Sequence, residues 1–277
     1  SSRAIQKLSK HKGYPYYHPF RHNVTDWSSV TIGGQNAYCV DLTNFNSSSG
    51  VDMGSSTVYD SLTYDQKYVI GHIMQFGAPD ASNVEWHIAT QTLIWEVVHG
   101  RIDLKTMKRV NDDIYNGTVG YNPGAVPYYD QIWNQVKEYE QVPSFMAPVQ
   151  VSAPTYRMPG SSSHFELELK NDNSKCSLSE FNFTSSGGIQ IDKEGETLKL
   201  SSSQELSTPV LISAYKGASG QTDSLLFWTG GNQQTRATPL QTNPVPAYCY
   251  IGTNDIGAFT IEINKVQYGT NLPLEGA

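Results

Sequence analysis

Two residues of this chain combine a reactive side chain with an unusual position. Cys39 lies within residues 37–42, an apolar segment that predicts a strand, and it follows Tyr38 directly. A cysteine thiolate is a good nucleophile, although an unpaired cysteine in a strand more often serves as a small buried apolar residue. Gln91 falls on the apolar face of a predicted helix, where an unpartnered amide costs about 1–3 kcal/mol. The Gln91 side chain is therefore either hydrogen-bonded in the core or used chemically.

The helix that carries Gln91 is predicted from the spacing of its inward positions. These positions recur at helical intervals, and they are Val84, Ile88, Gln91, Ile94, Trp95 and Val98. Thr63 is suited to cap the preceding helix, which residues 77–79 (Gly-Ala-Pro) must end. Asp80 or Ser82 is suited to cap the Gln91 helix itself.

Two more helices and a β-rich stretch complete the predicted order of elements. The helices are expected at residues 104–115 and 128–139. From about Val149 the apolar period changes to two, which predicts strands at residues 164–169, 197–200, 209–214, 225–228 and 247–251. This order predicts an α+β fold, in which a β-sandwich-like body carries an inserted helical subdomain.

Two motifs around Cys39 and Gln91 resemble those of a known family, the Cys-Gln thioester domains of Gram-positive surface adhesins. Residues 38–41 (Tyr-Cys-Val-Asp) are similar to its aromatic-Cys strand signature, and residues 90–95 (Thr-Gln-Thr-Leu-Ile-Trp) to its Thr-Gln-x-Ala-Ile-Trp helix signature. Residues 68–77 stand where the family has a helix whose Gln is followed by apolar residues. Leu93 replaces the family's small Ala, which should alter packing rather than chemistry.

The resemblance is strongest over residues 30–145 and looser over the β-rich half. It implies a domain organisation of four parts. They are a lead-in segment at 1–22, a thioester-forming region at 23–146 with a helical subdomain at about 61–143, a β-rich sandwich part of the same domain at 147–258, and a final strand or the start of an Ig-like stalk domain at 259–277. In such a stalk domain, Lys265 would be the first-strand lysine of an intramolecular isopeptide bond.

The residue types fit the chemistry that the resemblance implies. The Cys39 thiolate, held against the Gln91 side-chain carbonyl, would displace ammonia and leave a thioester that bridges strand and helix. An amine would then attack the former Gln91 carbonyl, giving an amide bond and a free thiol. We expect this amine to be a Lys side chain of a host cell-surface or extracellular-matrix protein. Because the reaction runs once per molecule and needs no cofactor, the resemblance implies a covalent adhesin and not an enzyme.

Four residues near the motifs are candidate helpers: His87, Tyr38, Trp95 and Asp41. His87 lies four residues before Gln91, on the same helix face, where it would assist proton transfer or simply pack. Tyr38 and Trp95 would shield the thioester from water, although ordinary core packing explains both equally well. Asp41 would orient a polar group near Cys39 or end the strand.

Two rival functions remain open at this point. The first is a thiol enzyme, a peptidase or a transglutaminase-like transferase, with Cys39 as nucleophile and His87 as base. The second is a carbohydrate-binding surface module that uses exposed aromatic side chains and needs neither Cys39 nor Gln91. The enzyme would keep a free thiolate, whereas the adhesin would hide its thiol in the thioester.

The other cysteines fit structural roles better. Cys249, between two tyrosines, resembles the aromatic-Cys pattern but lies far beyond Gln91, so we expect it in a strand core. Cys176 lies in a polar turn. The sequence is compatible with a disulfide between Cys176 and Cys249. The chain has three cysteines, so at least one is unpaired within it.

The bulk composition bounds the partners. The 277 residues carry a formal charge of −7 without any long Lys/Arg run, which excludes a nucleic-acid partner. No apolar segment is long enough to span a membrane, so we expect no membrane insertion. No His, Cys or acidic cluster has metal-ligand spacing, so we expect no metal site. We also expect a monomer. The resemblance implies an extracellular protein anchored to a bacterial cell wall.

Overall fold

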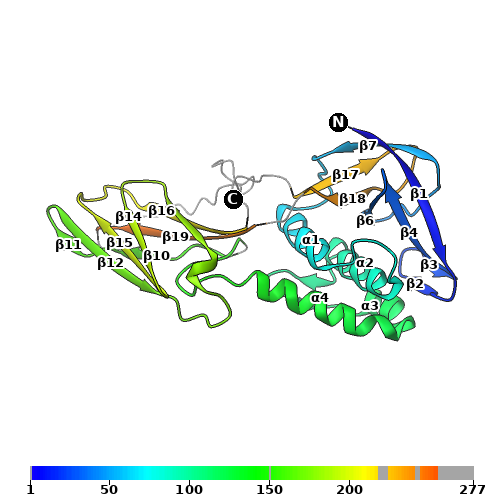
Figure 1. The fold of residues 1–277 in the computed structure, drawn as a ribbon, viewed down its shortest axis with the longest axis horizontal. Coiled ribbons are helices and arrows are strands. Elements are labelled where there is room, and N and C mark those ends of the chain that lie inside the picture. Colours follow the sequence, from blue (N-terminus) through cyan, green and yellow to red (C-terminus); the bar gives the residue numbers. More distant parts are fainter. Residues whose placement is uncertain (1, 150, 218–223, 241–243, 255–277) are drawn as a thin grey trace. The chain divides into compact units, whose positions relative to one another are not determined.

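A computed structural model describes residues 2–149, 151–217, 224–240 and 244–254 of the chain (Figure 1). The chain divides into two compact units. The first comprises Ser1–Lys137 and Asp223–Asn243, and the second comprises Glu138–Thr222 and Pro244–Ala277. The first unit therefore combines two segments that are separated in the sequence by the larger segment of the second unit.

A seven-stranded antiparallel sheet forms the framework of the first unit. Its order is β5-β4-β1-β7-β17-β18-β6. The strand bounds are β1 Arg3–His11, β4 Trp27–Ile32, β5 Gln35–Asn36, β6 Tyr38–Cys39, β7 Val51–Ser56, β17 Leu225–Thr229 and β18 Arg236–Pro239. The two-residue strand β6 lies at one edge, so one side of its backbone is free of ladder hydrogen bonds.

Helices and two short hairpins complete the first unit. The helices are α1 Tyr64–Phe76, α2 Val84–Val98, α3 Asp113–Thr118 and α4 Val126–Tyr139, with short 3-10 turns at Val119–Tyr121 and Pro123–Ala125. The hairpins pair β2 Tyr16–His18 with β3 His22–Val24 and β8 Ile102–Asp103 with β9 Lys108–Arg109. Helix α1 packs against β18 and α2 against β6, so the helices cover the edge that contains Cys39 (Figure 1).

The second unit is a β-sandwich. One four-stranded sheet has the order β10-β19-β16-β13 and the other β11-β12-β15-β14. Their bounds are β10 Thr155–Arg157, β11 Gly160–Ser161, β12 His164–Lys170, β13 Asn182–Ser185, β14 Gln190–Glu194, β15 Thr197–Ser202, β16 Val210–Lys216 and β19 Val245–Gly252, with a 3-10 turn at Leu178–Glu180. Alternate residues of both sheets, such as Leu198, Leu200, Ile212 and Ile251, share one buried apolar core.

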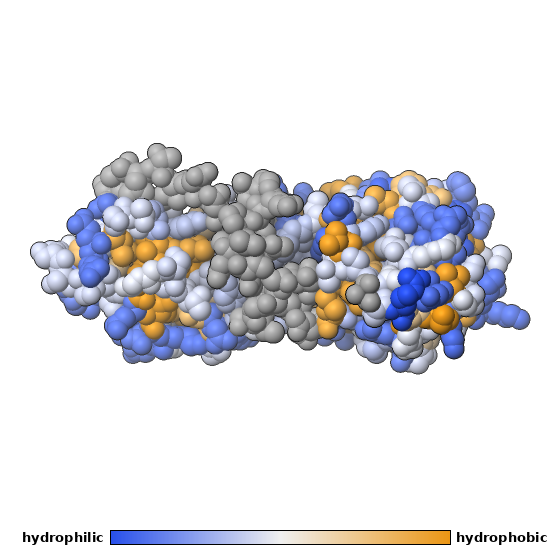
Figure 2. All heavy atoms as spheres, turned by 90° about the horizontal axis from the view of Figure 1, so that it is seen from above, coloured by the Kyte–Doolittle hydropathy of each residue, from blue (hydrophilic) through white to orange (hydrophobic). Residues whose placement is uncertain are grey.

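The α+β fold predicted from the sequence is confirmed. The N-cap expected at Thr63 is present. It is part of a capping box, because the Thr63 side chain accepts a hydrogen bond from Gln66 N–H and the Gln66 side chain accepts one from Thr63 N–H. Helix α2 is capped by Asn83 rather than by Asp80 or Ser82. On the face drawn in Figure 2, apolar patches are interrupted by hydrophilic residues. In the described part of the chain, no helix is long and apolar enough to span a bilayer.

Three boundaries differ from the sequence predictions. Residues 1–22 are not an irregular lead-in, because Arg3–His11 pairs with both β4 and β7. This strand is polar, with Gln6 as its fully buried residue, so backbone pairing and not apolar alternation defines it. Strands β17 and β18 belong to the first unit, whereas the sequence predicts that all of residues 147–258 belong to the β-rich sandwich part. Residues 259–277, including Lys265, lie outside the described residues.

The helix predicted at residues 104–115 is also wrong. A hairpin occupies residues 102–109, and α3 begins only at Asp113. The Asp103 side chain accepts a hydrogen bond from Lys105 N–H, and Met107 has a left-handed backbone with φ of 56°. The next two residues form β9 (Lys108–Arg109), and the Arg109 side chain pairs with the Glu96 carboxylate on α2.

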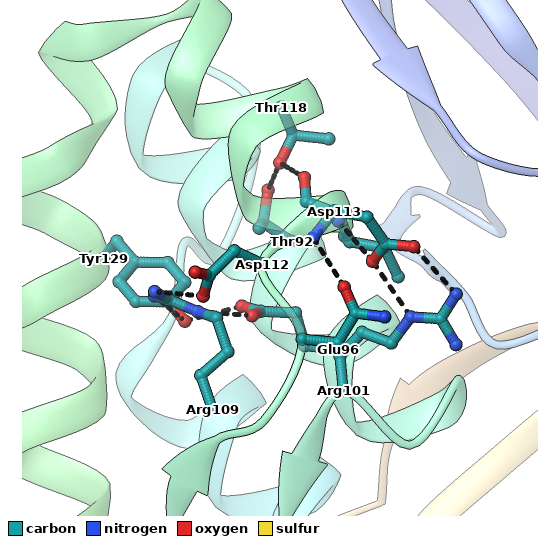
Figure 3. Close-up of polar contacts among 10 residues, drawn as sticks. Thr92, Glu96, Arg101, Arg109, Asp112, Asp113, Thr118 and Tyr129 are labelled. Atoms are coloured by element: carbon teal, nitrogen blue, oxygen red, sulfur yellow. Dashed lines mark hydrogen bonds and ion pairs between the residues drawn. The ribbon is translucent and has the colours of Figure 1, made fainter.

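Polar contacts hold α2 against its neighbours. The Thr92 hydroxyl donates to Thr118 Oγ1 of α3 over 2.8 Å. Glu96, which is fully buried, pairs with Arg109 Nε at 2.9 Å and accepts a hydrogen bond from the Tyr129 hydroxyl of α4 (Figure 3). Because these bonds have fixed directions, they fix the rotation of α2 about its axis more strictly than apolar contacts do.

Glu96 gives this network a pH dependence. Burial raises the pKa of Glu96 from 4.5 to about 7, and the hydrogen bond from Tyr129 and the charge of Arg109 only partly oppose this effect. A carboxyl group whose pKa is higher in the folded state stabilises the fold below its unfolded pKa. That contribution is lost as the pH rises through the folded value.

We therefore expect Glu96→Gln to gain stability relative to wild type as the pH rises from 4.5 to above 7. The gain should approach about 3 kcal/mol, because each pKa unit corresponds to about 1.4 kcal/mol. Urea unfolding of both proteins across this range measures it, and their difference cancels the contributions of other groups. Glu168→Gln, at an exposed acid, is the control and should show no such trend. A pH-independent difference for Glu96→Gln would contradict the assignment.

Candidate functional site

Cys39 and Gln91 lie side by side in the interior of the first unit. Cys39 is 1% exposed on β6 and Gln91 is 3% exposed on α2. The Gln91 Oε1 accepts a hydrogen bond from Cys39 N–H at 2.8 Å, and Gln91 Nε2 donates to Cys39 O at 3.0 Å. The carboxamide thus pairs with both backbone groups of Cys39, in the way that a neighbouring strand would.

This pairing is made available by the position of β6 at the sheet edge. On its other side, β6 pairs with β18, with Cys39 opposite Arg236. The ladder bond beside this pair runs from Val40 N–H to Thr235 O, so the N–H and C=O of Cys39 itself point away from β18. Those two groups would be orphaned in the interior without the Gln91 side chain.

The Gln91 carboxamide is held by the backbone of the residue that carries the thiol. Negative charge that developed on Oε1 would be stabilised by Cys39 N–H, which already donates to that atom. The thiol is oriented weakly, with Sγ 4.0 Å from Asp41 O. Rigid positioning of this kind replaces the cost of bringing two groups together from solution.

Two aromatic side chains close to this pair in the sequence are also buried. Trp95, one turn after Gln91, is 4% exposed and contacts the rings of Tyr16, Trp27 and His18. Tyr38 is equally enclosed, and its hydroxyl donates to Ala78 O at 2.7 Å. The pKa of the Cys39 thiol is raised by burial, and Arg236 and Trp95 partly oppose this effect.

His87 is locked into the surrounding packing. Its Nδ1 accepts a hydrogen bond from the Trp27 indole at 2.9 Å, and its Nε2 lies 3.2 Å from Asn36 Oδ1. Burial lowers the pKa of His87 to about 3, so the ring is neutral. Both nitrogens are engaged, and the ring leans on Tyr38 with 4.9 Å between centroids. This environment favours a packing role for His87 over proton transfer.

Asp41 organises the loop that follows β6. Its carboxylate accepts hydrogen bonds from the backbone N–H groups of Thr43 and Asn44, both at 3.3 Å. It also accepts one at 3.1 Å from Thr235 N–H, directly before β18. The Asp41 carboxylate therefore ties β6 to β18, while the contact of Asp41 with the Cys39 thiol is made by its backbone carbonyl.

Two residues of the site surroundings were missed in the sequence. His18 is fully buried against Trp95 and makes an edge contact with the His99 ring, and burial lowers the pKa of His18 to about 3. The aromatic run at Tyr16-Tyr17-His18-Pro19-Phe20 was a signal for a buried cluster. Arg236 is 5% exposed opposite Cys39. Nothing in the local sequence sets Arg236 apart, because its partner strand lies almost 200 residues earlier.

The remaining cysteines lie in the second unit and are not bonded to each other. Cys176 and Cys249 are both buried and free, so the disulfide considered between them is absent. Burial raises the pKa of Cys249 to about 12, as expected of a strand-core thiol. Within the described ranges, no group of three or more His, Cys, Asp or Glu side chains gathers as a metal site.

No protein-family model and no curated protein matches this sequence. Among solved structures, the chain is similar to the thioester domain of the Staphylococcus aureus TIE protein, with a TM-score of 0.50, 17% sequence identity, and coverage of 91% of this chain and 98% of that chain. The Bacillus anthracis TIE protein matches at a TM-score of 0.38 and 13% identity, over 90% of this chain and 48% of its own. The first likeness shows that this chain has the fold of a thioester domain.

We expect His87→Leu to destabilise the fold by about 1–3 kcal/mol, because it leaves the buried Trp27 N–H without an acceptor. Urea unfolding measures the loss. Trp27→Phe should remove the same bond, so the double variant should lose less than the sum of the two single losses. Additive losses would mean that the hydrogen bond between the two rings contributes nothing.

Proposed function

We propose that Cys39 and Gln91 form an internal thioester, and that the protein uses it as an adhesin to attach covalently to an amine on a target. The observation that carries this proposal is the pair of hydrogen bonds between the Gln91 carboxamide and the Cys39 backbone. These two bonds hold the Gln91 side-chain carbonyl beside the residue that carries the thiol. The thioester-domain fold supports the same conclusion.

Formation of the bond is an acyl transfer within the chain. The Cys39 Sγ attacks Gln91 Cδ, and Cys39 N–H stabilises the charge that builds on Oε1. The bond from Cδ to Nε2 then breaks, and ammonia leaves with the proton that the thiol gave up. The product is an acyl group stored in a site that Tyr38 and Trp95 keep dry.

Attachment to the target consumes the thioester between Cys39 and Gln91. The nitrogen of an incoming amine attacks Gln91 Cδ, the bond to Cys39 Sγ breaks, and the thiolate takes up the proton lost by the amine. A Lys side chain of a host surface or matrix protein is the amine we propose. Because Cys39 is not reacylated, each molecule reacts once, and the protein is a binder rather than an enzyme. Its place would be the outer surface of a Gram-positive cell, anchored to the wall.

The rival thiol enzyme fits the site less well. A catalytic cysteine needs an accessible thiolate and a free base. Cys39 is enclosed and burial raises its pKa, while both nitrogens of His87 are engaged. A labile thioester would also be a poor permanent cross-link, since amines and water cleave it, so a thioester at this site would be a bond meant to react.

We expect the purified protein to weigh less than its sequence by the mass of one ammonia. Cys39→Ala and Gln91→Ala should each restore the full mass, because either change removes one half of the bond. Cys249→Ala, at a buried cysteine of the second unit, is the matched control and should keep the deficit. Intact mass spectrometry of fresh native protein decides this, and an unmodified mass for wild type would refute the thioester.

Covalent attachment requires a second measurement. Wild type and Cys39→Ala are incubated with host cell-surface or matrix proteins, boiled in denaturant and examined for a heavier band. Wild type alone should form it, because Cys39→Ala lacks the activated carbonyl, and peptide mapping should join Gln91 to a target Lys. If methylamine consumes the thioester but no protein is ever captured, the adhesin function is wrong even though the bond exists.

A further inference from the structure

Within the part of the chain that the structure describes, Arg236 is a buried cation without a carboxylate partner. Its side chain on β18 is 5% exposed, and among the described residues it meets neutral acceptors. Nη1 donates to Ala37 O at 3.1 Å and Nη2 to Ser47 Oγ at 3.5 Å, while Nε has no partner within the described ranges. An enclosed guanidinium is expensive to desolvate, so an arginine held this way needs an anion to justify its cost.

The sheet register brings Arg236 to Cys39. The two residues are opposite each other in the antiparallel pair of β18 and β6. Since Cys39 gives its N–H and C=O to Gln91, this is a non-hydrogen-bonded pair, in which the Cβ atoms approach to about 4.5–5.5 Å on one face of the sheet. The contact from Nη1 to Ala37 O keeps the guanidinium alongside β6.

Among the described groups around the thiol, the second cation that acts on this pair is already hydrogen-bonded elsewhere. Burial lowers the pKa of Arg236 to about 10, and Cys39 is the strongest influence in the opposite direction. Arg236 is in turn the largest influence that opposes the rise in the pKa of Cys39. The polar and titratable groups that act on this pair from the neighbouring elements are Tyr16, Arg21, Asp41, Tyr59, His87 and Trp95. Of these, Arg21 is cationic, but its guanidinium is committed to the Tyr16 hydroxyl.

We propose that Arg236 is the charge partner of Cys39 Sγ, and that it stabilises the thiolate that attacks Gln91 and the thiolate that leaves when an amine arrives. This inference rests on the proposed thioester. In formation, the charge exists between loss of the thiol proton and closure of the bond from Sγ to Cδ. In attachment, it exists between cleavage of that bond and return of a proton from the amine nitrogen. In a dry site, a nearby guanidinium stabilises such a charge far more than it would in water.

The test separates this role from the thioester itself. In a Gln91→Ala background no thioester can form, and the ultraviolet absorbance of the thiolate reports the titration of Cys39. Subtracting the Cys39→Ala/Gln91→Ala protein removes the signals of Cys176, Cys249 and the tyrosines. Arg236→Met, an apolar residue of similar length, should lower the Cys39 thiolate fraction at a given pH by roughly tenfold or more. Arg3→Met, an exposed arginine of the same sheet, should change nothing.

A charge-keeping variant guards against misfolding. Arg236→Lys retains a cation, so the thiol should titrate close to its parent value, and methylamine should consume the thioester of Arg236→Lys much faster than that of Arg236→Met. The inference is overturned if folded Arg236→Met titrates like its parent. If Arg236→Met does not fold, a thiol in Arg236→Lys that ionises tenfold less than in the parent overturns it. Because the titration uses Gln91→Ala, its outcome is independent of whether wild type ever loses ammonia.

Discussion

The first unit depends on one interaction, the double hydrogen bond between the Gln91 carboxamide and the backbone of Cys39. An edge strand of two residues leaves an N–H and a C=O facing the interior, and a glutamine on a buried helix satisfies both. The contact therefore closes the sheet edge and joins sheet to helix. It also holds an electrophilic carbon beside a thiol, so the structural solution and the reactive one are the same geometry.

That geometry requires α2 to be fixed both in rotation about its axis and in position along it. The helix is almost wholly apolar or buried, so apolar packing alone would allow it to slide or turn. Directional bonds at three residues of α2 remove this freedom: Thr92 bonds to α3, Glu96 to β9 and α4, and Thr90 accepts a bond from Ala78 N–H, after α1. Gly77 belongs to the same contact, because a Cβ there would lie 2.3 Å from a Thr90 methyl.

Exclusion of water has opposite effects on the two halves of the chemistry. A dry site protects a thioester from hydrolysis, and it also disfavours the thiolate needed to make or break one. In the proposed chemistry, the buried rings of Tyr38 and Trp95 would provide the first effect. Arg236 offsets the second, since it supplies the opposite charge from inside the same enclosure. Burial of an unpaired arginine is thus consistent with a site that needs an anion only transiently.

The sequence by itself determined the local elements and the two central residues. Helical spacing located α2, the N-cap at Thr63 located α1, and period-two alternation located the sandwich strands β12, β15, β16 and β19, because these signals depend on neighbours a few residues apart. The tertiary structure decided which strands pair and which side chains face each other. The polar strand β1, the return of β18 to β6, the engagement of both His87 nitrogens and the position of Arg236 all depend on pairings across many residues. Ladder partners and buried charges leave no periodic trace in the chain, so only the folded geometry reveals them.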